Sequence, residues 1–123
     1  GVPPATLPEL LLADPTGPLA ALLPAPDPSD PEQLFRASLT MASILQFTWP
    51  LPDKGLAKRL YRLKAPTLLV WGAEDRLVHP AYGDDFGAAL RDARLEVIPG
   101  AGHLPQLEQF DATRAAIEAF LAA

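Results

Sequence analysis

The chain has 123 residues, of which 49% are hydrophobic and 20% charged, a composition typical of one small globular domain with its own core. Its formal net charge of −5 excludes nucleic acid and anionic membranes as expected partners, because such contacts need a clustered basic surface. The absence of cysteine excludes disulfides, thiolate metal sites and a cysteine nucleophile, and we expect a cytoplasmic protein.

The first part of the chain is rich in proline, since eleven of the 15 prolines lie within residues 1–52. Each proline removes a backbone N–H donor and restricts the residue before it, so this part cannot form one continuous helix or strand. We expect short helices at residues 8–14 and 18–23.

A longer helix is predicted from Pro31 to about Phe47, where apolar residues recur with helical spacing. Ser29 or Asp30 would cap it, and proline suits its first turn because the N–H is unpaired there in any case.

After the proline-rich part, helical and strand patterns alternate. Residues 53–63 have a helical pattern, with Asp53 near the start and Leu56, Leu60 and Leu63 on one face. Residues 80–92 are also helical in pattern, and residues 110–123 form an alanine-rich closing helix. Residues 65–72 form a continuous apolar run that ends in glycine, as expected of a strand buried on both faces of a parallel sheet, and residues 93–100 form a second short strand. This order predicts an α/β fold.

The predicted sheet is incomplete, because two parallel strands are too few for a stable sheet. A fully apolar strand expects neighbours on both sides, so we expect further strands upstream, in another chain or in a symmetry mate. The closing helix is expected to turn Ile117, Phe120 and Leu121 inward, with Phe110 in the core.

Two loops carry side chains suited to catalysis. Asp75 lies in "WGAEDRLVHP" after the first strand, and His103 ends "PGAGH" after the second. Both loops leave carboxyl ends of parallel strands, so the two side chains are expected at one edge of the sheet, where ligands collect. A carboxylate there can accept the imidazole N–H and stabilise the imidazolium. A turn-capping aspartate and a structural loop histidine are the alternatives.

At residues 66–109, "PTLLVWGAEDRLVHP" and "EVIPGAGHLPQLEQ" resemble the last two strand–loop units of the α/β-hydrolase fold, in its lid-bearing single-domain branch. The resemblance implies that residues 53–123 are the C-terminal part of the hydrolase core, with its last two parallel strands and flanking helices. It also implies that residues 1–52 are a partly helical lid. Asp75, rather than Glu74, matches the acid of the Ser-Asp-His triad, and His103 matches the general base.

The nucleophile of that family is missing from the chain. It normally stands on a Gly-x-Ser-x-Gly turn between a strand and a helix. Ser29, Ser38 and Ser43 have neither flanking glycines nor a preceding strand, and the glycine-rich oxyanion loop is absent too. Ser38 and Ser43 are expected to be surface or back-bonded hydroxyls of a helix. We expect this chain alone to be inactive.

For a complete enzyme the resemblance implies hydrolysis of an ester, acyl or C–C bond in a small apolar ester- or ketone-type substrate, without a cofactor. The same scaffold hosts epoxide and halide displacement with an aspartate nucleophile, and perhydrolysis. Trp49, Val78 and Leu104 are candidates to line the substrate pocket, although Trp49 also suits an anchor inside the lid.

A second hypothesis is a non-catalytic fragment or subunit that assembles through its open sheet edge, with itself or with an N-terminal half. A flavodoxin-like binding domain would need phosphate-binding loops, which the glycine-containing turns do not match. No metal site is expected from two histidines at unsuited spacing, and His79 is interpreted as an exposed turn residue. No apolar run reaches the roughly 18 residues of a membrane span.

Overall fold

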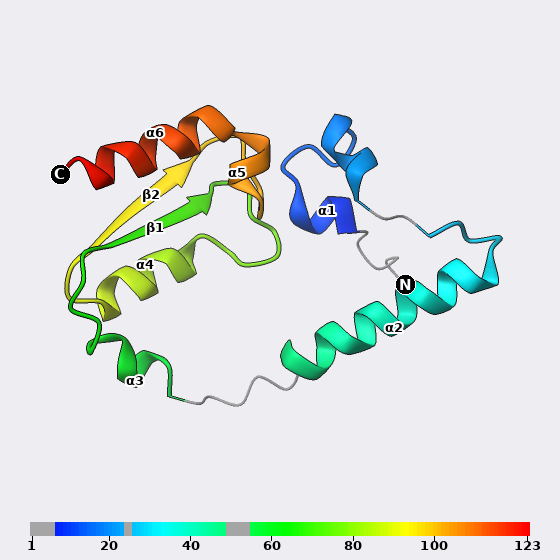
Figure 1. The fold of residues 1–123 in the computed structure, drawn as a ribbon, viewed down its shortest axis with the longest axis horizontal. Coiled ribbons are helices and arrows are strands. Elements are labelled where there is room, and N and C mark those ends of the chain that lie inside the picture. Colours follow the sequence, from blue (N-terminus) through cyan, green and yellow to red (C-terminus); the bar gives the residue numbers. More distant parts are fainter. Residues whose placement is uncertain (1–6, 24–25, 49–54) are drawn as a thin grey trace. The chain divides into compact units, whose positions relative to one another are not determined.

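The computed structural model describes residues 7–23, 26–48 and 55–123 (Figure 1). Contacts within the chain divide it into two compact units. One unit joins Gly1–Leu23 to Ala57–Ala123, and the other is Pro24–Leu56. The first segment of the chain therefore belongs with the strands. The predicted lid boundary after residue 52 stays a prediction.

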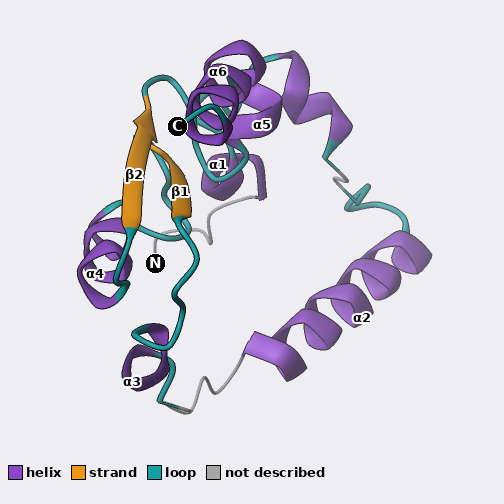
Figure 2. Ribbon diagram, turned by 60° about the vertical axis from the view of Figure 1, so that its left-hand side comes forward, coloured by secondary structure: helices purple, strands orange, loops and turns teal. Residues whose placement is uncertain are grey.

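The larger unit alternates helices with two strands. Its elements are α1 (Leu7–Leu11), the 3-10 helix η1 (Pro18–Leu22), α3 (Ala57–Leu60), β1 (Thr67–Gly72), α4 (Ala81–Ala89), β2 (Ala93–Ile98), α5 (Pro105–Glu108) and α6 (Phe110–Leu121). The strands β1 and β2 pair in parallel, from Thr67 opposite Ala93 to Gly72 opposite Ile98. Figures 1 and 2 show α4 and α6 on opposite faces of this sheet. The α/β fold class is confirmed, as two parallel strands in an open sheet with flanking helices.

The parallel register brings the carboxyl ends of β1 and β2 to the same edge of the sheet. Thr67, Val70 and Trp71 in β1 and Val97 and Ile98 in β2 are β-branched or aromatic residues, which favour the pleated conformation. The side chains of β1 are half-buried rather than fully buried as the apolar run predicts, and only Gly72 at its end is buried. The reason is that, within the described residues, each strand has one neighbour and one open edge.

Helix α4 packs against the sheet through a glycine. A Cβ at Gly83 would lie 3.0 Å from Leu95 Cδ1 and 3.2 Å from the ring of Trp71, so the missing side chain allows the helix to come close. Phe86 of the same helix contacts Trp71 with ring centroids 6.4 Å apart. These contacts fix the carboxyl end of β1, where the loop of Asp75 begins.

The helices after the strands differ from prediction in two respects. Residues 105–108, for which the sequence predicts no helix, form α5. Helix α6 exposes Phe110 (59%) and Leu121 (76%), whereas the sequence predicts Phe110 in the core and Leu121 facing inward. Ile117 is also exposed. A helix that covers two strands has a narrower surface to pack on than a full sheet offers, so part of its apolar face stays uncovered.

The helix predicted over residues 53–63 is reduced to α3, Ala57–Leu60. Leu56 and Leu63, expected on one apolar face with Leu60, are about half exposed. Asp53, expected near the helix start, lies outside the described residues. The helical spacing is present, but too little of the described chain packs against this face to stabilise a longer helix.

The smaller unit, Pro24–Leu56, is built around α2 (Pro31–Thr48), close to the predicted bounds. Asp30 caps this helix, because its Oδ1 accepts the N–H groups of Glu32 (2.9 Å) and Gln33 (3.2 Å). No helix in the described parts of either unit is long and apolar enough to cross a bilayer.

Candidate active site

The loop after β1 is fixed by its contacts with the loop after β2. Glu74 N–H donates to Ala101 O (2.9 Å), and Ala101 N–H donates back to the Glu74 side chain at Oε2 (3.0 Å). A Cβ at Gly72 would collide with the backbone oxygens of Ala101 and Gly102, so only glycine permits this approach. Glu74 therefore joins the two loops, and the carboxylate that hydrogen-bonds His103 is that of Asp75.

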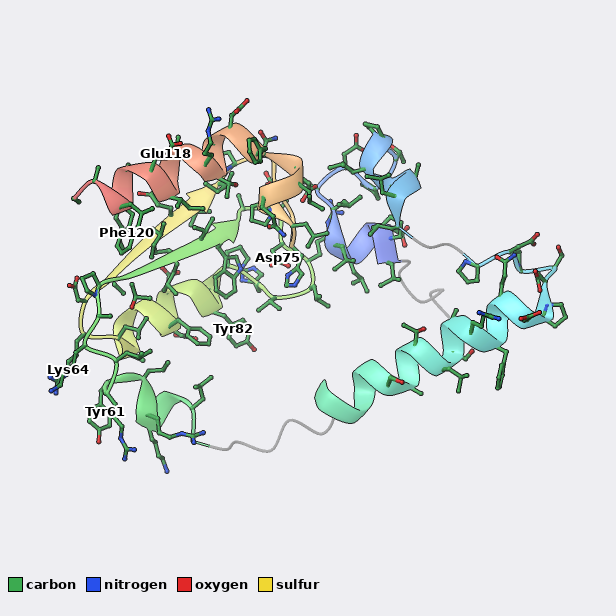
Figure 3. The ribbon with its side chains drawn as sticks, in the orientation of Figure 1. Tyr61, Lys64, Asp75, Tyr82, Glu118 and Phe120 are labelled. Atoms are coloured by element: carbon green, nitrogen blue, oxygen red, sulfur yellow. The ribbon has the colours of Figure 1, made fainter. Side chains whose placement is uncertain are left out.

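Asp75 is buried near the start of this loop, with 7% of its surface exposed. Its Oδ1 accepts the N–H groups of Leu77 (2.9 Å) and Val78 (2.8 Å), and its Oδ2 lies 2.9 Å from His103 Nδ1. Both oxygens are thus used, one by the turn and one by the imidazole. Figure 3 labels Asp75 in the loop beyond β1. The turn-capping role and the contact with histidine, considered as alternatives from the sequence, occur together.

His103 follows a turn in which Gly100 has φ +71°, a conformation that favours glycine. Its main-chain N–H donates to Leu11 O at 2.8 Å, and 35% of its side chain is exposed. Because an ionised carboxylate only accepts hydrogen bonds, the contact with Asp75 assigns the proton to Nδ1. Nε2 is then the acceptor, and among the described residues it has no hydrogen-bond partner. An imidazole in this state can take a proton from a nucleophile.

Arg76 in the loop after β1 and Glu108 at the end of α5 hold the segment that ends α1, and the sequence indicates neither contact. Glu108 accepts Ala13 N–H at Oε1 and Gly102 N–H at Oε2, both at 2.6 Å. Arg76 donates to the carbonyl oxygens of Glu9 and Leu12, both at 3.3 Å. From the sequence alone, Gln106 and Glu108 are interpreted as loop and helix-start residues. No sequence motif indicates the hydrogen bond of Glu108 with Ala13, because its donor is a main-chain N–H group 95 residues away.

The structure describes two of the three residues that the sequence predicts to line a substrate pocket. Trp49 lies outside the described residues. Val78 and Leu104 are half-buried in the two loops, and Val78 O accepts the indole N–H of Trp71 at 2.9 Å. Their role in a pocket stays a prediction. His79 is exposed and its Nδ1 accepts Ala81 N–H (3.2 Å) at the start of α4, as expected of a turn residue.

The three serines lie in the Pro24–Leu56 unit and bond within it. Ser38 and Ser43 donate to the carbonyl oxygens of Leu34 (2.8 Å) and Leu39 (2.9 Å), the back-bonding expected inside a helix. Ser29 donates to Asp27 Oδ1 at 2.7 Å. In the described ranges, no group of three or more His, Asp or Glu side chains is arranged to hold a metal ion.

Comparison with known proteins gives a consistent result. The model of the "alpha/beta hydrolase fold" family matches residues 20–110. The chain is 40% identical over 63 residues to a 2-hydroxy-6-oxononadienedioate/2-hydroxy-6-oxononatrienedioate hydrolase of Comamonas testosteroni, which covers 51% of the chain and 22% of the relative. It is 41% identical, with the same coverage, to a 2-hydroxy-6-oxo-6-phenylhexa-2,4-dienoate hydrolase of Burkholderia cepacia. The chain therefore spans about a fifth of the length of these relatives.

A solved structure extends the likeness beyond the strands. A thermophilic esterase superimposes with a TM-score of 0.60 and 26% identity, over 94% of this chain and 43% of the esterase chain.

Proposed function

Because the chain belongs to the alpha/beta-hydrolase fold family, we propose that it forms the C-terminal part of a hydrolase in which His103 is the general base and Asp75 orients it. The nucleophile would come from a part of the protein upstream of this chain. The proposal rests above all on one observation, the 2.9 Å contact between Asp75 Oδ2 and His103 Nδ1.

The proposed mechanism follows from how the carboxylate is held. Two main-chain N–H groups fix Oδ1, so Asp75 cannot rotate away from the imidazole without losing them. With Nδ1 protonated, His103 Nε2 takes the proton of the nucleophile as the nucleophile attacks the substrate carbonyl. The imidazolium, stabilised by Asp75, then gives this proton to the leaving group. In a second step His103 takes a proton from water, which hydrolyses the acyl intermediate and restores the enzyme.

The substrate class is proposed from the relatives. Two of them are named as hydrolases of 2-hydroxy-6-oxo-dienoates, and a structural neighbour is named as an esterase. We therefore favour hydrolysis of a C–C bond next to a ketone in a substrate that carries a carboxylate, with ester hydrolysis as the alternative. In both reactions the base accepts a proton from the nucleophile and delivers it to the departing carbon or oxygen, so the same pair serves both.

The test is an assay of the full-length gene product on p-nitrophenyl butyrate and on a 2-hydroxy-6-oxo-dienoate. His103→Ala and Asp75→Asn should each lower kcat by a factor of about 10³–10⁴, because the base is lost or its tautomer is no longer fixed. His79→Ala is the matched control, because His79 is an exposed histidine in the loop after β1. This variant should retain wild-type kcat. A folded His103→Ala variant with wild-type kcat would contradict the proposal. The isolated chain should show negligible hydrolysis.

A second function is favoured by the open edges of the two-stranded sheet. Half-buried side chains on β1 and exposed Val97 on β2 leave apolar surface and unpaired strand edges within the described part of the chain. The isolated chain should therefore self-associate or bind an N-terminal half of the same protein. Light scattering that shows a stable compact monomer would exclude this assembly.

A further inference from the structure

One carboxylate joins the histidine loop to the beginning of the chain. Glu108, the last residue of α5, accepts Ala13 N–H at Oε1 and Gly102 N–H at Oε2, and both distances are 2.6 Å. Hydrogen bonds from N–H groups to a carboxylate are shorter and stronger than those between neutral groups. The main chain directly before His103 is thus fixed to a segment that lies 89 to 95 residues away in sequence.

The same segment is held at two further points, one beside each member of the proposed pair. His103 N–H donates to Leu11 O at 2.8 Å. Arg76, the neighbour of Asp75, donates to Leu12 O at 3.3 Å. All of these contacts use main-chain atoms of the segment, and they add to the anchoring that the buried Leu12 side chain provides.

The fit between segment and loop is close. A Cβ at Gly102 would lie 2.7 Å from Leu11 O and 2.8 Å from Ala13 N, so the segment lies directly against the Gly102 backbone. Leu12, between these two contacts, is 2% exposed. A shift of the segment would therefore carry the main chain of Gly102 and His103 with it.

His103 depends on this support more than Asp75 does. The Asp75 carboxylate is fixed by N–H groups of its own turn. Within the described residues, the His103 ring makes one hydrogen bond, to Asp75, and about a third of the side chain is exposed. The orientation of the ring therefore depends on both the hydrogen bond to Asp75 and the position of the His103 main chain.

From these contacts we infer that Glu108 is a positioning residue, which fixes the main chain at Gly102 and through it the His103 imidazole against Asp75. This inference rests on the proposed function, because the geometry that it maintains is that of the general base. Small displacements of a base lower the rate of the chemical step without removing the surface that binds substrate. Two N–H donors meet Glu108, so both carboxylate oxygens are needed.

The discriminating variant is Glu108→Gln in the full-length protein. Glutamine has the same shape but one acceptor oxygen, so its NH₂ group would face one of the two N–H donors. We expect kcat on the p-nitrophenyl ester to fall about 10–100-fold with KM within about twofold, because the base is displaced while the surface that binds substrate is kept. Glu118→Gln on α6, where the glutamate is exposed and pairs loosely with Arg114, is the matched control and should keep wild-type values.

A second readout does not depend on catalysis. The Nδ1 proton of His103, hydrogen-bonded to Asp75, should give a downfield ¹H signal that Asp75→Asn removes. Glu108→Gln should shift or broaden this signal, and Glu118→Gln should leave it in place. Arg76→Met, which releases the same segment with Glu108 intact, should lower kcat in the same direction but less. The Arg76→Met variant therefore tests the inference even if Glu108→Gln does not fold.

The outcomes separate the two proposals. If His103→Ala is inactive while a folded Glu108→Gln keeps both kcat and the Nδ1 signal, the positioning role is overturned and the proposed function stands. A raised KM with unchanged kcat in Glu108→Gln also overturns it. If His103→Ala is fully active, the proposed function fails, but a shifted Nδ1 signal in Glu108→Gln still supports the structural coupling.

Discussion

The two compact units of the chain use their polar side chains differently. In Pro24–Leu56, the described side-chain hydrogen bonds join residues at most six positions apart, such as Asp27 N–H with Gln33. In the loops after β1 and β2, several join residues 27 to 95 positions apart, among them Glu74 with Ala101 and Glu108 with Ala13. The first kind stabilises one helix. The second fixes separate segments of the chain against each other.

This difference indicates where substitutions should matter. A local hydrogen bond can be lost without moving any other element, because its partner belongs to the same turn. A long-range hydrogen bond between the loops after β1 and β2 positions the Asp75–His103 pair, so its loss should affect both loops at once. The predictions below test this contrast, beginning with the substitution expected to have the largest effect.

Gly72→Ala should disrupt the contact between the loops after β1 and β2. The added Cβ would collide with backbone oxygens of Ala101 and Gly102, which cannot rotate away as a flexible side chain can. We expect the free energy of unfolding, from urea denaturation followed by circular dichroism, to fall by more than about 4 kcal/mol or the protein not to fold.

The matched control for Gly72→Ala is Gly87→Ala in α4. A Cβ there would meet only Leu69 Cδ1, at 4.0 Å, and alanine favours a helix, so stability should rise by about 0.5–1 kcal/mol. Equal effects of the two substitutions would show that the loop contact is not as close as described.

Much of the fold follows from the sequence because its signals are local. The apolar runs of β1 and β2 and the helical spacing of α2, α4 and α6 are each contained within one element. The meeting of Asp75 and His103 follows as well, since parallel strands place both loops at one edge of the sheet. This step needs the pairing of the strands but no knowledge of side-chain packing.

The remaining features depend on contacts that leave no local signal. The partners of Glu108 and Arg76 are main-chain atoms of residues 9–13, and every residue type carries the same N–H and C=O groups apart from proline. The length of α3 and the exposure of Phe110 depend on what packs against them, which helical spacing alone does not show. Nothing in their own segments could therefore have indicated them.

Asp30 gives a local effect that depends on pH. Its pKa is held below the ordinary aspartate value by hydrogen bonds from the Gln33 backbone, the Gln33 side chain and the Glu32 backbone. Since the folded pKa is lowered, the ionised cap stabilises α2 above the unfolded pKa, and this contribution is lost as pH falls through the folded pKa. NMR secondary shifts of Glu32 and Gln33 should become less helical over that acidic range.

Asp30→Asn keeps a side-chain acceptor at position 30 that does not titrate, so the loss of helical shifts at acidic pH should be smaller than in the wild type. Asp30→Ala should weaken them at neutral pH. In both variants the Nδ1 signal of His103 should be unchanged. Unaltered helical shifts in Asp30→Ala would show that the cap does not stabilise α2.

The smallest effect is expected for Ser38→Ala combined with Ser43→Ala. Each hydroxyl donates a hydrogen bond to a carbonyl one turn earlier in α2. That carbonyl already accepts a main-chain hydrogen bond of the helix, so it does not need the second one. The lost bond and the higher helix propensity of alanine oppose each other, so stability should change by less than about 0.5 kcal/mol. The same double variant in the full-length protein should retain wild-type kcat, because neither serine is the proposed nucleophile. A loss of activity with unchanged stability would place one of these hydroxyls in the reaction and would remove the contrast between a local helix and a long-range site.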